Sequence, residues 1–155
     1  MTSAKAFGFG LFYVSAGAWR TIRWVNAVSR LSGLPNRAVS DVIGISPAWG
    51  PSGIALFAFA DVVVAPFAEE YLYRGVLLPW LTTWMNRSAA MAWCALAFGA
   101  VHLYYGAGAA VTVVGGLVMA WARLETGKLR ASVALHMAWN AVTIAAFVLP
   151  SAGPG

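Results

Sequence analysis

The sequence predicts an all-α fold, a polytopic transmembrane bundle of about five to six helices, in which residues 1–155 form a single membrane domain. Hydrophobic residues make up 61% of the chain and charged residues 10%, whereas soluble domains average about 45–50% and about 25%. A chain of 155 residues is too short to bury so much apolar surface in one core. The basic residues also flank the apolar runs, as in membrane loops and unlike nucleic-acid-binding surfaces.

Residues 1–53 are expected to form an N-terminal helix, an interfacial segment and a loop. The apolar run at 6–19 is short for a membrane span. Residues 21–42 interleave aliphatic side chains with arginines, which is typical of an interfacial amphipathic helix, and the Pro- and Gly-rich stretch 36–53 predicts a loop. A signal peptide cleaved near 16–18 is the alternative. A first helix or anchor is favoured because the stretch that follows stays apolar between its arginines.

Residues 54–149 contain the predicted helical core. The apolar stretch 54–85 is long enough to cross a bilayer and is interrupted by Pro66. It therefore forms either one long kinked helix or two helices joined at the proline. Polar turns separate three further predicted helices, at 89–105, 107–124 and 129–149.

The distribution of basic residues predicts how the chain is oriented. Two polar turns are marked by basic residues: Arg87, and then Arg123, Lys128 and Arg130. These turns fall on one side if the helices alternate, and the positive-inside rule makes that side cytoplasmic. The arginines between 20 and 37 are compatible with this orientation only if their segment lies at the membrane interface. We expect a multi-pass protein of the cell membrane.

Three ionisable residues lie close together in the first long apolar stretch: Glu69, Glu70 and Arg74. On insertion scales a central Asp, Lys or Arg costs about 2.5–3.5 kcal/mol, while each Leu or Val returns only about 0.3–0.6 kcal/mol. Such residues must face protein or water, and they are functional by default. Glu70 and Arg74 are four apart and can pair. A purely structural ion pair is the alternative, but it leaves Glu69 without a partner on its own helix.

Further polar residues lie in the later apolar helices. His102 falls near the end of the 89–105 segment, and His136 and Asn140 are four apart, hence on one helix face. A histidine bonded to a carbonyl and an interhelical polar clamp are the structural alternatives. The only cysteine, Cys94, excludes an intramolecular disulfide and a Cys-rich metal site. The recurrence of polar residues in apolar helices predicts one shared polar site.

These residues form three motifs, which resemble those of the CPBP (CAAX protease and bacteriocin-processing, or Abi) family of intramembrane endopeptidases. The motifs are E-E-x-x-x-R from Glu69, F-x-x-x-H from Phe98 and H-x-x-x-N from His136. The resemblance covers about residues 54–149, and Tyr73 replaces the Phe often found before the arginine. The catalytic residues that it implies are Glu69, Glu70, His102, His136 and Asn140, with Arg74 and Phe98 in support.

The resemblance also implies a role for each residue. Glu69 would be the general base that activates water, assisted by His102. His136 and Asn140 would stabilise the oxyanion of the tetrahedral intermediate. Glu70, paired with an arginine, would support this site. The expected activity is hydrolysis of a peptide bond in a membrane-associated protein or peptide, as in the processing of CAAX-type or sorting tails.

Several alternatives to this mechanism and function remain. Glu69, His102 and His136 could supply three zinc ligands with one open position, although we expect no metal and no cofactor. A Ser132–His136 dyad lacks an acid to orient it. A non-catalytic membrane immunity or partner-binding protein, or a proton-coupled transporter, could carry the same polar residues. The expected partners are the substrate and the lipid bilayer, not nucleic acid.

Overall fold

The computed structural model describes residues 27, 29–31, 33 and 49–148. The predicted N-terminal helix, most of the interfacial segment and most of the loop lie outside these residues. Between residues 49 and 148 every regular element is helical, which confirms the all-α prediction for this part of the chain. The total of about five to six helices includes the N-terminal segment and stays a prediction.

The first long apolar stretch forms one continuous helix of 33 residues, Gly50–Thr82. Of the two predicted alternatives, the single helix is therefore the correct one. It begins four residues earlier than expected, because Pro51 fits the first helical turn, where its missing N–H is not needed. Its consecutive segments are α3 (Gly50–Phe59), η2 (Ala60–Val64), α4 (Ala65–Glu70), η3 (Tyr71–Leu77) and α5 (Leu78–Thr82).

The segments η2 and η3 are wide π-helical turns, and each lies just before a proline. Proline lacks an N–H and its ring crowds the carbonyl four residues earlier, so a regular ladder cannot continue through it. In η2 the N–H of Ala65 donates to the oxygen of Ala60, five residues back, and Pro66 follows. The carbonyl of Asp61 is thereby left without a donor from its own helix.

Three further helices follow: α6 (Arg87–Ala100), α7 (Ala109–Thr126) and α8 (Leu129–Val148). The side chain of Asn86 caps α6 by accepting a hydrogen bond from the N–H of Ala89 at 3.0 Å. The predicted helix 89–105 is wrong at its end. It stops at Ala100, and a 3-10 turn, η4 (Leu103–Tyr105), leads to Gly106 at φ 62°, a conformation that glycine adopts without strain.

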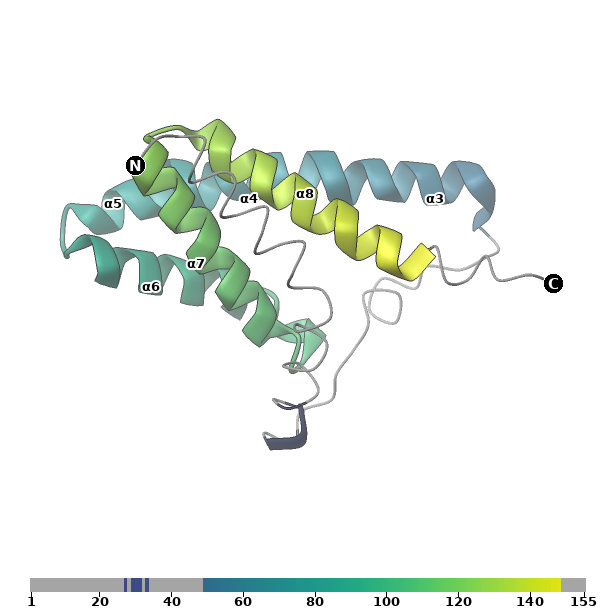
Figure 1. The fold of residues 1–155 in the computed structure, drawn as a ribbon, viewed down its shortest axis with the longest axis horizontal. Coiled ribbons are helices and arrows are strands. Elements are labelled where there is room, and N and C mark those ends of the chain that lie inside the picture. Colours follow the sequence, from purple (N-terminus) through teal and green to yellow (C-terminus); the bar gives the residue numbers. More distant parts are fainter. Residues whose placement is uncertain (1–26, 28, 32, 34–48, 149–155) are drawn as a thin grey trace.

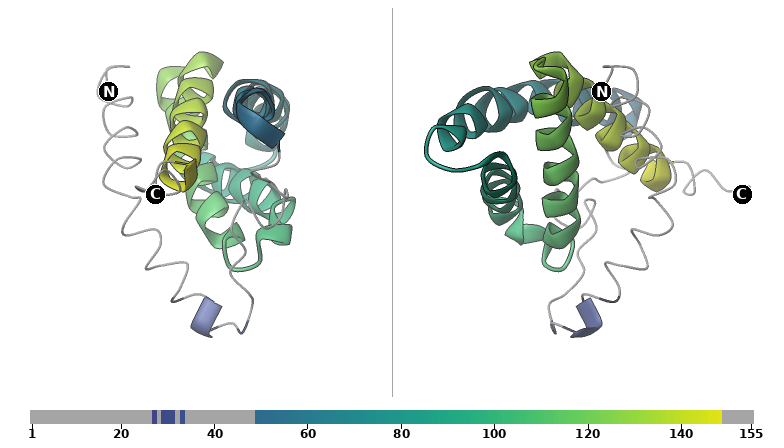
Figure 2. Two further views of the ribbon diagram at one scale, coloured as in Figure 1. Left: turned by 90° about the vertical axis from the view of Figure 1, so that its right-hand side faces the viewer. Right: turned by 60° about the vertical axis from the view of Figure 1, so that its left-hand side comes forward.

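The helices pack through small residues and in antiparallel pairs. The long helix and α8 run side by side, and α7 crosses between α6 and α8 (Figures 1 and 2). A Cβ atom at Gly99 of α6 would collide with Val113 of α7, and one at Gly116 would lie 3.2 Å from the backbone of Ala95. Glycine at these positions lets the backbones of α6 and α7 approach closely, as in membrane helix pairs.

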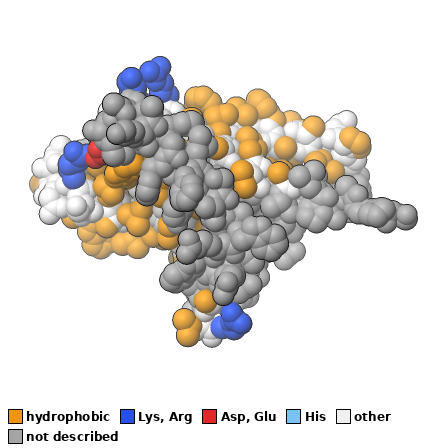
Figure 3. All heavy atoms as spheres, viewed as in Figure 1, with side chains coloured by type: hydrophobic (Ala, Val, Ile, Leu, Met, Phe, Trp, Pro, Cys, Tyr) orange, Lys and Arg blue, Asp and Glu red, His pale blue; other side chains and the backbone are white. Residues whose placement is uncertain are grey.

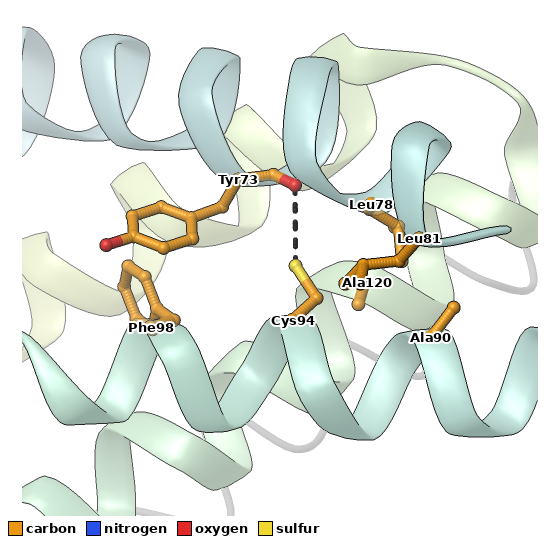
Figure 4. Close-up of a cluster of buried hydrophobic side chains, with 7 residues drawn as sticks. All are labelled: Tyr73, Leu78, Leu81, Ala90, Cys94, Phe98 and Ala120. Carbon is orange, nitrogen blue, oxygen red and sulfur yellow. Dashed lines mark hydrogen bonds between the residues drawn. The ribbon is translucent and has the colours of Figure 1, made fainter. Parts of the chain in front are cut away.

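A hydrophobic cluster fills the space between the second half of the long helix and α6. Figure 4 shows the residues of this cluster, which are Tyr73, Leu78, Leu81, Ala90, Cys94, Phe98 and Ala120. The thiol of Cys94 donates to the carbonyl oxygen of Tyr73 at 3.3 Å. Cys94 is fully buried and therefore serves as a small packing residue. The cluster fixes α6 against the helix that carries the glutamates.

Within the part of the chain that the structure describes, two helices, Gly50–Thr82 and Ala109–Thr126, are long and apolar enough to cross a membrane. Only 6% of the most apolar window of the first is buried inside the structure, so it is not the core helix of a soluble domain. Large hydrophobic side chains are exposed along it, including Phe59, Phe67 and Trp80. Figure 3 shows a broad hydrophobic surface beside basic side chains at the end where α7 turns into α8.

Candidate active site

A buried ion pair forms the base of the site. Glu70 and Arg74 are both fully buried, and Nη1 of Arg74 donates to Oε1 of Glu70 at 2.8 Å. Nη2 of Arg74 donates to the carbonyl oxygen of Gly116 on α7 at 2.9 Å. A Cβ atom at Gly116 would lie 3.3 Å from this nitrogen, so glycine makes room for the contact. The guanidinium also lies over the Phe98 ring, 4.6 Å from its centroid.

His136 of α8 lies between the two glutamates. Its Nδ1 is 3.0 Å from Oε1 of Glu70, within hydrogen-bond range, so the imidazole donates there. Its Nε2 is 3.6 Å from Oε2 of Glu69, which is longer than a direct hydrogen bond. The buried ion pair therefore orients the ring, and Nε2 is directed at the gap before Glu69.

Glu69 differs from its neighbour in exposure. Its side chain keeps 32% of its accessible surface, whereas the Glu70 side chain keeps none. This difference follows from the helix itself, because adjacent residues point about 100° apart. One glutamate thus builds the interior of the site, and the other remains partly exposed at its edge.

His102 lies in the turn that follows α6, with backbone angles of −100° and 11°. Its Nδ1 is 2.7 Å from the carbonyl oxygen of Phe98. A carbonyl only accepts, so Nδ1 donates, and a neutral ring then has Nε2 free to accept a proton. The Phe98 ring contacts both histidines, with centroids 4.6 Å from His102 and 5.6 Å from His136. Phe98 is therefore the spacer that holds the two imidazoles.

Asn140 lies one helical turn beyond His136 and contacts η2, the first of the two wide turns in the long helix. Its Nδ2 donates to the carbonyl oxygen of Asp61 at 2.8 Å, the carbonyl that Pro66 leaves without a helical donor. The amide therefore joins α8 to η2, as the structural alternative of a polar clamp predicts. An asparagine amide carries two N–H groups, and only one is used in this bond.

The structure thus gathers the residues of all three motifs around one site. Glu69 interacts electrostatically with both histidines. Direct contacts connect Glu70, Arg74, Phe98 and the two histidines. Asn140 contacts the long helix at the Asp61 carbonyl. Among the described residues, no three His, Cys, Asp or Glu side chains are arranged to hold a metal ion.

Asp61 is a residue that sequence reasoning missed. Its half-buried carboxylate interacts electrostatically with His136 and with His102, the same two groups that face Glu69. The signal was present, because an aspartate in the apolar stretch 54–85 satisfies the criterion that identified the glutamates. It lies outside the three motifs.

The comparison with known protein families gives a match over residues 51–142. The matching family is described as type II CAAX prenyl endopeptidase Rce1-like. The matched range covers more than half of the chain and contains all three motifs. No curated protein and no solved structure shows a significant match.

Proposed function

The chain belongs to the Rce1-like family of type II CAAX prenyl endopeptidases, and on that premise we propose that it is a glutamic intramembrane protease. The family establishes a membrane-embedded, CAAX-type endopeptidase in general. We propose more specifically that it hydrolyses a peptide bond near the C-terminus of a prenylated or otherwise membrane-associated protein or peptide, with a water activated by Glu69 and the histidines. We further place it in the cell membrane as a multi-pass protein.

One observation supports this mechanism above the others. A solvent-accessible carboxylate, Glu69, lies 3.6 Å from Nε2 of an imidazole whose other nitrogen is held by the buried Glu70–Arg74 pair. The two groups do not bond directly, and a water beside them could contact both. Glu69 would take a proton from this water as it attacks, and Nε2 of His102 is available to assist as a second acceptor.

The developing oxyanion would be stabilised from α8. Asn140 can offer its second amide N–H. His136 already donates from Nδ1 to Glu70, so it offers an Nε2–H only in the form protonated on both nitrogens. One nitrogen of each side chain already donates within the protein, to Glu70 and to the Asp61 carbonyl. Fixed donors need no reorganisation when charge develops on the carbonyl oxygen, which is the property that makes such sites effective.

Removal of the base tests the proposal. The protein reconstituted in vesicles is assayed on a prenylated CAAX peptide, and its host membranes are compared by proteomics. Glu69→Gln keeps the shape of the side chain and should lower turnover by at least about 100-fold, the scale of a lost acid–base group. Glu125→Gln is the matched control, because it removes one carboxylate from an exposed ion pair with Arg87.

The outcomes distinguish a protease from its alternatives. Substrates that accumulate uncleaved with Glu69→Gln, and not with Glu125→Gln, support the protease. Full cleavage by Glu69→Gln contradicts the role of Glu69. No cleavage by the wild type, together with an unchanged peptide map, favours a partner-binding membrane protein.

A further inference from the structure

Asp61 is the carboxylate that the proposed mechanism does not use. It lies eight residues before Glu69 in the same apolar helix, and its backbone oxygen is bonded to Asn140. Its side chain interacts electrostatically with both histidines of the site, and Tyr105 interacts with both carboxylates in the same way. Asp61 and Glu69 therefore border one polar region.

The contacts of Asp61 do not explain why an aspartate is present. Its hydrogen bond to Asn140 uses the backbone oxygen, which any residue would supply. No residue within the described part of the chain forms an ion pair with its carboxylate. An ionisable group in an apolar span is costly and usually faces a functional partner. A cation that is not one of the described side chains could therefore pair with this carboxylate.

Hydrolysis of a peptide bond creates such a cation at this place. The water oxygen bonds to the carbonyl carbon, the C–N bond breaks, and both water protons end on the nitrogen. The products are a carboxylate on one fragment and an ammonium group on the other. The intact substrate carries a neutral amide at the same position, so an anionic residue there interacts more strongly as the reaction proceeds.

We propose that Asp61 is a positioning residue that binds the amino group formed on the departing C-terminal fragment. The inference rests on the proposed function and deepens it, because it names the group that the leaving-group side of the site binds, a primary ammonium. Glu69 acts on the water and Asp61 acts on the amine. The carboxylate stabilises the nitrogen as it gains protons, and it holds the released fragment until it departs.

The test compares two peptides that differ only at the amino terminus. The C-terminal fragment that cleavage of the assay peptide releases is prepared with a free amine and with an acetylated amine. Equilibrium binding of each is measured to detergent-solubilised wild type, Asp61→Asn and the control Glu125→Gln. Asp61→Asn should weaken binding of the free amine by at least about tenfold, the scale of one charge-assisted hydrogen bond, and leave the acetylated peptide unchanged.

Kinetics provide the second readout. Asp61→Asn should lower kcat by a similar factor and leave KM for the intact substrate nearly unchanged, because the amide carries no charge before cleavage. Asp61→Glu, which keeps the charge, should recover part of the selectivity for the free amine. Asp61→Ser gives the same comparison if Asp61→Asn does not fold.

The binding experiment does not depend on turnover, so the two proposals fail separately. A wild type that prefers the free amine through Asp61 but cleaves nothing refutes the protease and supports the ammonium site. Equal binding of the two peptides by the wild type refutes the ammonium site, whatever the cleavage result. A loss of thermal stability in Asp61→Asn, without any change in amine selectivity, assigns Asp61 to an internal ion pair and also overturns the proposal.

Discussion

Glu70→Gln should destabilise the fold as well as impair the site. The substitution keeps the size of the side chain and its acceptor oxygen, but it removes the negative charge opposite Arg74. Both side chains are fully buried and 2.8 Å apart. The guanidinium would remain in the interior, held by Gly116 and the Phe98 ring, without an anion to compensate for its lost hydration.

The expected magnitude follows from this burial. Breaking a buried ion pair by neutralising one partner costs about 3–5 kcal/mol, against a total stability of about 5–15 kcal/mol for a typical domain. His136 also loses the charge on its acceptor Oε1, 3.0 Å from Nδ1, so we expect a value in the upper part of this range. The exposed pair Arg87–Glu125, with side chains 60% and 29% exposed, should contribute less than about 1 kcal/mol.

The assay is reversible denaturant unfolding in a mild detergent, followed by tryptophan fluorescence. Glu70→Gln is compared with Glu125→Gln, so that each variant removes one glutamate charge. The double variant Glu70→Gln/Arg74→Met should lose less unfolding free energy than the two single variants lose together, because it removes both members of the pair. If Glu70→Gln unfolds at the same denaturant concentration as Glu125→Gln, the buried pair does not stabilise the protein and the reasoning is refuted.

Two further predictions concern the metal question and the topology. Exhaustive chelation should leave cleavage of the CAAX peptide intact, and the purified protein should contain less than stoichiometric zinc, because a glutamate–histidine site needs no metal. If activity were lost on chelation and restored by added zinc, Glu69 and the histidines would be metal ligands instead. For the topology, cysteines are introduced at Ser88 and Lys128, which are both exposed, in a Cys94→Ala background. Both should react only from the cytoplasmic side, because the Arg87–Glu125 salt bridge places the α5–α6 and α7–α8 turns at one end. Labelling of the two cysteines from opposite sides would contradict this arrangement.

The ionisable residues in apolar helices could be identified from the sequence because the membrane leaves few reasons for them to be there. Glu69, Glu70, His102 and His136 were expected at one site, and the structure brings them together. The pairing of Glu70 with Arg74 also follows from their spacing of four. These features depend on polarity and on helical period, and both can be read along a single chain.

The contacts between helices could not be predicted in this way. The hydrogen bond between Glu70 and His136 joins residues 66 apart, and it depends on how α8 crosses the long helix. Nothing in the H-x-x-x-N spacing shows that Asn140 donates to the Asp61 carbonyl, because that carbonyl is freed by a wide turn that periodicity does not reveal. The end of α6 before His102 was missed for a related reason, since the surrounding residues stay apolar beyond it.

The two wide turns of the long helix allow it to keep its faces in register across an extra residue. A π turn contains one residue more than the α turn that it replaces, and η2 and η3 stand on either side of α4, which carries both glutamates. In η2 the N–H of Ala65 bonds to the oxygen of Ala60 five residues back. If one residue between them were removed, the same bond would span four residues, as in a regular α turn, and the glutamates would still face α8. A residue removed from a regular α turn would instead swing everything beyond it by about 100°. We therefore expect single-residue gaps among natural relatives to fall within the wide turns and not within α4.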